Sequence, residues 1–121
     1  MVVKNEESIK PIPIEDAEKA FIQPLITRFD EAPNIELRKI SIKPGGRIPP
    51  HLHPEIEHVQ YVLKGSFLIK IGEESYKVKP GDAILIPPNT VHYYENNGDE
   101  ETAFICMIPR KEYTTIMLER L

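Results

Sequence analysis

The sequence predicts a single-domain, all-β protein. Short segments rich in β-branched and aromatic residues recur about every 8–12 residues, a spacing typical of sandwiches and barrels. Turn residues separate these segments, and no stretch between them has the helical period that parallel βαβ units require. A chain of 121 residues suits one domain with a core of its own.

Eight segments from Leu25 onward are predicted to be strands. They are 25–29, 35–42, 58–64, 66–71, 75–79, 83–87, 91–95 and 102–108, and a further β-rich piece, 113–118, could instead be a helical turn. The breaks APN, KPGGRIPP, KG, GEE, KPGD, PPN and NNGDE each contain Gly, Pro, Asn or Asp, which favour chain reversal. Because Lys64-Gly65 is the only turn signal between 58–64 and 66–71, these two segments are predicted to form a hairpin.

Residues 1–30 are predicted to form an arm or edge strands outside a barrel of residues 31–121. The first 20 residues carry Pro11 and Pro13 and show no clean period. Residues 15–21, EDAEKAF, are interpreted as a short helical turn that Pro24 limits.

Composition excludes several classes of protein. The net charge of -4 argues against nucleic acid as a partner, because duplex-binding domains carry a basic face. No signal-peptide h-region and no run of 18 apolar residues is present, so we expect a soluble, cytoplasmic protein with no membrane partner. Cys106 is the only cysteine, which excludes an intrachain disulfide.

The histidines are concentrated in one place. His51, His53 and His58 lie within eight residues, and His92 is the only other histidine. An isolated histidine is more often solvated or hydrogen-bonded than metal-bound, so the arrangement carries the argument. On an extended chain His51 and His53 point to the same face, and the flanking prolines hold that chain extended. Alternate residues of a barrel strand point inward, so all four imidazoles could meet inside.

Imidazole nitrogens suit Mn, Fe, Cu, Ni or Zn better than Mg or Ca. We therefore predict a divalent transition-metal site at His51, His53, His58 and His92, with the identity of the metal open. Predicted cavity-lining residues are Gln60, Tyr94, Phe104 and Cys106. Both faces of 102–108 are apolar, so whether Phe104 and Cys106 or their neighbours line the cavity stays open.

Two stretches resemble the two motifs of the cupin family. GGRIPPHLHPEIEHVQYVLKG (45–65) resembles the first motif, and GDAILIPPNTVHYYEN (81–96) resembles the second. The resemblance implies a double-stranded β-helix, or jelly roll, and relates the chain to small four-histidine cupins of thermophiles that hold manganese. Because cupins often dimerise through additional strands, it also implies a homodimer in which residues 1–30 take part.

Two positions depart from the motifs. The family's glutamate position falls on His58, with Glu57 as the competitor. The spacing to Gly65 favours His58, as does a register that places Gln60 and Val62 inward beside it. Asn89 replaces a glycine expected to need positive φ, which asparagine tolerates better than other residues.

Four neutral imidazoles would leave the charge of a divalent ion uncompensated, which favours an anionic ligand. The first function hypothesis is a metal-dependent oxygenase acting on a small anionic or enolisable substrate. The second is a sugar-acid lyase or isomerase, with Arg47 or Lys64 as the base that binds its carboxylate. The third is a non-enzymatic ligand-binding or sensing cupin. Glu55 and Glu57 are the nearest candidate acids or bases, and solvated charges are the favoured interpretation of both.

Overall fold

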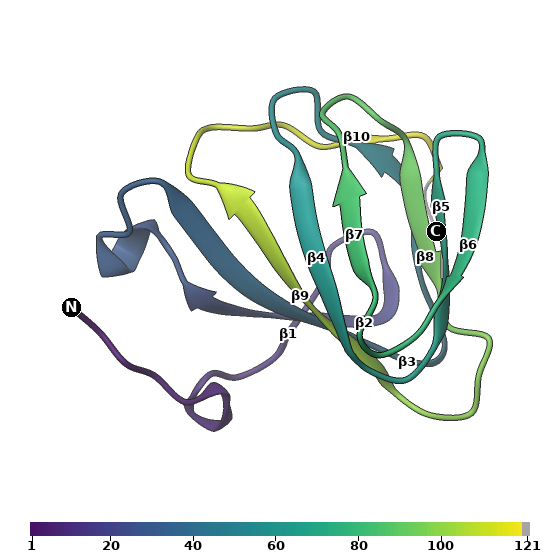
Figure 1. Cartoon of the computed structure of the whole chain (residues 1–121), viewed down its shortest axis with the longest axis horizontal. Coiled ribbons are helices and arrows are strands. Elements are labelled where there is room, and N and C mark those ends of the chain that lie inside the picture. Colours follow the sequence, from purple (N-terminus) through teal and green to yellow (C-terminus); the bar gives the residue numbers. More distant parts are fainter. Residues whose placement is uncertain (120–121) are drawn as a thin grey trace.

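The computed structural model describes residues 1–119 and confirms the all-β architecture (Figure 1). Ten strands belong to one curled sheet: β1 (Ile12–Pro13), β2 (Glu18–Ile26), β3 (Ile35–Leu52), β4 (His58–Lys64), β5 (Phe67–Ile71), β6 (Glu74–Val78), β7 (Ala83–Ile86), β8 (His92–Glu95), β9 (Thr102–Pro109) and β10 (Ile116–Met117). Two 3-10 turns, η1 (Glu6–Ser8) and η2 (Arg28–Asp30), are the described helical elements. Neither is long enough to cross a lipid bilayer.

The sheet has the order β6-β5-β8-β3-β9-β4-β7, and all its described pairings are antiparallel. β3 is its longest strand and belongs to both halves. Its first part pairs with β9, from Ile35↔Pro109 to Ile42↔Thr102, and its second part pairs with β8, from Arg47↔Glu95 to His51↔His92. The break predicted at KPGGRIPP is therefore wrong: the strand continues through this segment by changing partners.

The predicted hairpin between 58–64 and 66–71 is also wrong. β4 pairs with β7 and β9, whereas β5 pairs with β6 and β8. Gly65 adopts a φ of 67°, and a Cβ there would lie 2.8 Å from the carbonyl oxygen of Glu101. This glycine therefore turns the chain from one half of the sheet to the other, where a side chain would meet backbone.

The helical turn expected at residues 15–21 is a turn only at Glu15 and Asp16, and from Glu18 onward the segment is a strand. β2 begins at Glu18 and pairs with β3 from Glu18↔Arg47 to Ile26↔Leu37. The hydrogen bonds offered by β3 outweigh the helical tendency of EDAEKAF, since propensity is a weak prior against tertiary context. The segment predicted as strand 25–29 ends at Ile26, after which η2 begins.

The core lies inside the curl and is packed with aromatic rings. Phe104 is fully buried and stacks on Phe67, at 5.2 Å between ring centroids, and on Tyr94, at 5.1 Å. Tyr94 also lines the cavity described below, so this stack joins the core to the site.

Replacing Phe104 with alanine should therefore lower the free energy of unfolding by about 3–5 kcal/mol. Phe29, which is 92% exposed, provides the matched control, and Phe29→Ala should change stability by less than about 0.5 kcal/mol. Urea unfolding followed by circular dichroism measures both. Equal effects of the two substitutions would contradict the assigned core.

Candidate metal centre

Four histidines from three strands meet at one end of the sheet. His51 lies in β3, His53 follows the end of that strand, His58 begins β4 and His92 begins β8. All four are buried. The ring centroids are 4.2 Å apart for His51 and His92, 4.9 Å for His53 and His58, and 5.3 Å for His58 and His92.

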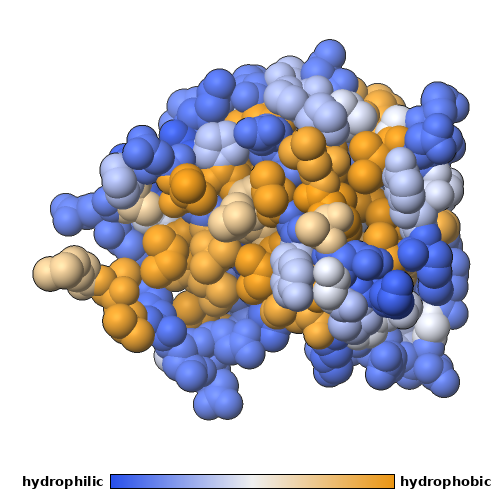
Figure 2. All heavy atoms as spheres, in the orientation of Figure 1, coloured by the Kyte–Doolittle hydropathy of each residue, from blue (hydrophilic) through white to orange (hydrophobic). Residues whose placement is uncertain are grey.

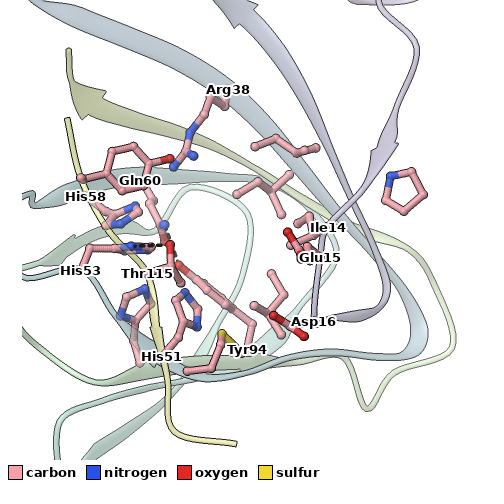
Figure 3. A pocket seen from close by; sticks show the side chains of 17 residues that line it. Ile14, Glu15, Asp16, Arg38, His51, His53, His58, Gln60, Tyr94 and Thr115 are labelled. Carbon is pink, nitrogen blue, oxygen red and sulfur yellow. Dashed lines mark hydrogen bonds between the residues drawn. The ribbon is translucent and has the colours of Figure 1, made fainter. Parts of the chain in front are cut away.

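Three of these histidines could hold one ion together. Ring nitrogens of His51, His53 and His92 all lie within 4.8 Å of one another. His58 lies outside this close group, with its ring beside His53 and His92. Figure 3 shows the rings of His51, His53 and His58 converging on one side of the cavity.

The Nδ1 atom of every one of these rings has a partner. The contacts are His51 Nδ1 to Pro49 O at 2.7 Å, His53 Nδ1 to Thr114 O at 3.1 Å, His92 Nδ1 to Thr90 O at 2.9 Å and His58 Nδ1 to Cys106 Sγ at 3.2 Å. A carbonyl oxygen only accepts, so in the first three rings Nδ1 carries the hydrogen and Nε2 keeps its lone pair. Such partners hold metal-binding imidazoles in the required tautomer and orientation.

Two of the free nitrogens are buried without a partner. Among residues 1–119, neither His58 Nε2 nor His92 Nε2 has a hydrogen-bond partner. A buried ring nitrogen without a partner is costly, and coordination to an ion would satisfy it. The donor set of imidazole nitrogens therefore fits a divalent transition metal.

Burial keeps these imidazoles neutral. Desolvation is the main cause that lowers the pKa of His53 to about 4, of His92 to about 3 and of His58 to about 2, and it also lowers the pKa of His51. The charge of Arg38 is the second cause at His58. Neutral imidazole is the form that binds metal, so the rings are ready to coordinate at neutral pH.

The turn of the second motif holds the H-x-H segment in place. Asn89 has a φ of 58°, as predicted for the residue at this glycine position, and its N–H donates to the carbonyl oxygen of His53 at 2.9 Å. Asn96 is fully buried and donates from Nδ2 to the carbonyl oxygens of Ile42 and Glu100. These two asparagines therefore connect the strands that carry the histidines.

The register predicted for β4 is confirmed. His58, Gln60 and Val62 are buried, whereas Glu57 is exposed. Glu57 lines a separate shallow hollow near Met107, outside the histidine cavity.

The cavity beside the histidines has a volume of about 480 Å³. Gln60 and Tyr94 line it, and Gln60 Nε2 donates to the Tyr94 hydroxyl at 2.7 Å. Phe104 and Cys106 point inward from β9 but are buried behind that wall, outside the cavity lining. Ile14, Glu15 and Asp16 form the opposite wall (Figure 3).

Sequence reasoning missed the C-terminal segment that closes over His53. Thr114 offers its carbonyl oxygen and Thr115 its hydroxyl to His53 Nδ1, the latter at 3.2 Å. Glu55, a candidate acid or base, instead accepts hydrogen bonds from Thr114, which lower the pKa of its carboxyl. The β-rich pattern of 113–118 was the available signal, and its strand, β10, pairs with the end of β3 beside His51.

Sequence reasoning also placed the basic residue of the cavity wrongly. Neither Arg47 nor Lys64 lines it: Arg47 pairs with Glu119 at 2.8 Å, and Lys64 lies 3.9 Å from Glu101. Arg38, from β3, does line it. The available signal was strand alternation, which places Arg38 on the face of the buried Ile40 and Ile42.

Comparisons with known proteins agree with this architecture. The chain is 31% identical over 112 residues to protein MJ1618 of Methanocaldococcus jannaschii, covering 87% of this chain and 84% of that protein. It is 37% identical over 77 residues to germin-like protein subfamily 2 member 1 of Arabidopsis thaliana, but spans only 35% of that protein's length. The solved structure of the polyketide cyclase RemF from Streptomyces resistomycificus superposes with a TM-score of 0.91 and 25% identity, covering 100% of this chain and 87% of RemF.

The family follows from the residues that carry the site. Residues 38–108, which include all four histidines and both motif turns, match the cupin domain family. Together with the jelly-roll sheet and the likeness to MJ1618 over most of both chains, this match shows that the chain belongs to the cupins.

Proposed function

We propose that this cupin binds a divalent transition metal through His51, His53, His58 and His92 and acts on a small anionic or enolisable substrate. The observation that carries the proposal is the state of the four rings. Their Nδ1 atoms are held by partners, while the Nε2 atoms of His58 and His92 are buried without one.

Manganese, iron, copper, nickel and zinc all suit imidazole donors, so the identity of the metal stays open. Such an ion, when bound, supplies Lewis-acid chemistry, and a redox-active one also supplies chemistry with dioxygen. The histidines would hold it, and the cavity of about 480 Å³ has the size of a small-molecule site.

The surrounding side chains would orient a substrate rather than exchange protons with it. Burial raises the pKa of Tyr94 far above its usual value, so its hydroxyl stays protonated and Gln60 holds it in place. A protonated phenol donates a hydrogen bond to an oxygen that gains negative charge, as in the enolate of a carbonyl compound.

Oxygenase chemistry on an enolisable anion is our first candidate. The second candidate is an isomerase, lyase or cyclase that forms an enolate from such an anion and does not use dioxygen. Its support is the likeness to a polyketide cyclase over the whole chain. A non-enzymatic ligand-binding cupin is the third candidate.

A homodimer and a cytoplasmic location stay predictions from the sequence. One feature supports the dimer: Val59, Tyr61, Leu85 and Met107 form an exposed apolar area on the outer side of β4, β7 and β9. Figure 2 shows hydrophobic residues gathered across the middle of the molecule in this view.

Pyruvate, a small enolisable anion, tests the proposed activity. Protein loaded with Fe(II) or Mn(II) should accelerate deuterium exchange of the pyruvate methyl group in D₂O at least about tenfold over a His92→Ala control, because the metal stabilises the enolate. Proton NMR measures the exchange and an oxygen electrode measures oxygen uptake. Deuterium exchange together with oxygen uptake supports the oxygenase, and exchange without oxygen uptake supports the second candidate. If neither exchange nor oxygen uptake is observed, the non-enzymatic ligand-binding cupin is the remaining candidate.

A pair of substitutions tests the fourth ligand. His58→Ala should weaken metal binding by at least about 100-fold, since loss of even an outer partner of a ligand typically costs 10–100-fold. Glu57→Ala, one residue away on the exposed face, should leave affinity within about twofold. Competition with a chromophoric chelator measures both, with circular dichroism as the check on folding. Loss of metal from the Glu57 variant alone would falsify the assignment.

The lowered pKa values predict how metal affinity depends on pH. A histidine with the ordinary pKa of about 6.5 would lose about tenfold in affinity by pH 5.5 through competition with protons. Here the pKa values of His53, His92 and His58 are about 4, about 3 and about 2, so at these three rings protons compete only as the pH approaches 4, and burial lowers the pKa of His51 as well. We expect the Co(II) affinity to change by less than about threefold between pH 7.5 and 5.5 in calorimetric titrations. A loss of 100-fold or more over that range would contradict the buried, neutral state of the rings.

A further inference from the structure

Arg38 is a cation on the inner face of β3, next to the buried Glu36 on the same face. It is followed on this face by Ile40 and Ile42, both buried in the core, and it lines the same cavity as the four histidines. Figure 3 shows its guanidinium directed toward Gln60 and His58.

Within residues 1–119, this guanidinium has no anionic partner. No described carboxylate lies within 4.0 Å of its nitrogens, whereas Arg28 pairs with Glu36 and Arg47 pairs with Glu119. Its Nη2 atom donates to a sulfur atom, Cys106 Sγ, at 3.2 Å. The Nε atom is buried and has no hydrogen-bond partner among those residues.

An unpaired cation is unfavourable in a partly buried position such as that of Arg38, unless something else compensates its charge. Arginine cannot lose its proton in a protein, so its charge persists whatever surrounds it. Removing such a charge from water without an anion costs free energy, and arginine is therefore rarely buried unless paired. Its planar set of N–H donors matches a carboxylate, which it can bind through two parallel hydrogen bonds.

Arg38 and His58 lie close enough for one small anion to reach both sides of the cavity. Arg38 Nη2 and His58 Nδ1 each lie 3.2 Å from the same atom, Cys106 Sγ, so they are at most twice that distance apart. A ligand therefore needs only a few atoms to link the guanidinium to the histidine side of the cavity.

The carboxylates of the cavity lie on another wall. Glu15 and Asp16, from the turn between β1 and β2, face the cavity across from the histidines (Figure 3). Glu15 is exposed at the mouth. The charge of Glu15 disfavours an anion at the mouth and leaves the Arg38 end as the place for one.

We propose that Arg38 is the carboxylate-binding residue of this cavity, so that the substrate is a compact carboxylic acid with a second oxygen, such as a 2-oxo or 2-hydroxy acid. The carboxylate binds the part of the Arg38 guanidinium that lines the cavity, and the second oxygen lies toward the histidines. The inference deepens the proposed function and rests on it only for the metal end of the ligand.

The Nε–H group of Arg38 allows a direct test. In ¹⁵N-labelled protein its NMR signal, assigned by its loss in Arg38→Lys, should shift and saturate as pyruvate is added. The neutral analogue pyruvamide should shift it far less. Titrations of both metal-free and Zn(II)-loaded protein measure this, and neither depends on catalytic activity.

Substitution gives the second measurement. Arg38→Gln should raise the dissociation constant for pyruvate on the order of tenfold or more, with Arg38→Lys between it and the wild type. Arg47→Gln is the matched control: it removes the same charge from the same strand, lies outside the cavity lining, and should change the constant by less than about twofold. If Arg38→Gln does not fold, the NMR titrations of the wild type and the dissociation constant of Arg38→Lys test the inference instead.

The outcomes separate the two proposals. The inference is overturned if pyruvate does not shift the Arg38 signal in either the metal-free or the Zn(II)-loaded protein. It is also overturned if Arg38→Gln leaves the dissociation constant for pyruvate unchanged, even if zinc binds. Protein that takes up no zinc, but whose Arg38 signal still moves with pyruvate and not with pyruvamide, overturns the metal site and leaves the carboxylate-binding residue standing.

Discussion

The site depends on burying four imidazole rings in one cavity while giving each Nδ1 atom a fixed partner. Three of these partners are backbone carbonyl oxygens, of Pro49, Thr90 and Thr114, and the fourth is the sulfur of Cys106. Backbone acceptors are held by the sheet and its turns, so the rings cannot rotate freely. The same burial keeps the rings neutral, because a charged imidazole would be poorly solvated there.

The partners of the rings also explain several features of the fold around them. The left-handed conformation of Asn89 aligns its N–H with the carbonyl oxygen of His53, and β10 pairs beside His51. Cys106 lies behind the cavity wall, where its sulfur contacts His58, Arg38 and Gln60. A change at this one atom would therefore reach the His58 ring and the Arg38 guanidinium together.

The polar and charged groups of the cavity lie on separate sides of it. Neutral imidazoles occupy one side, the Arg38 guanidinium is next to them, and Glu15 and Asp16 are across from them. A bound divalent cation would add to the positive potential at the inner end, which favours anions and stabilises negative charge formed during reaction.

The sequence by itself determined the all-β class, the two motif turns and the inward register of His58 over Glu57, because strand alternation and turn residues act over a few positions. It did not determine the path of β3 through KPGG, the partners of β4 and β5, or the strand at 18–26. Nor did it identify Arg38 as a cavity residue, or Thr114 and Thr115 as the partners of His53 Nδ1. These depend on hydrogen bonds and contacts between residues far apart in the chain, for example 61 positions between His53 and Thr114, and only the folded sheet decides them.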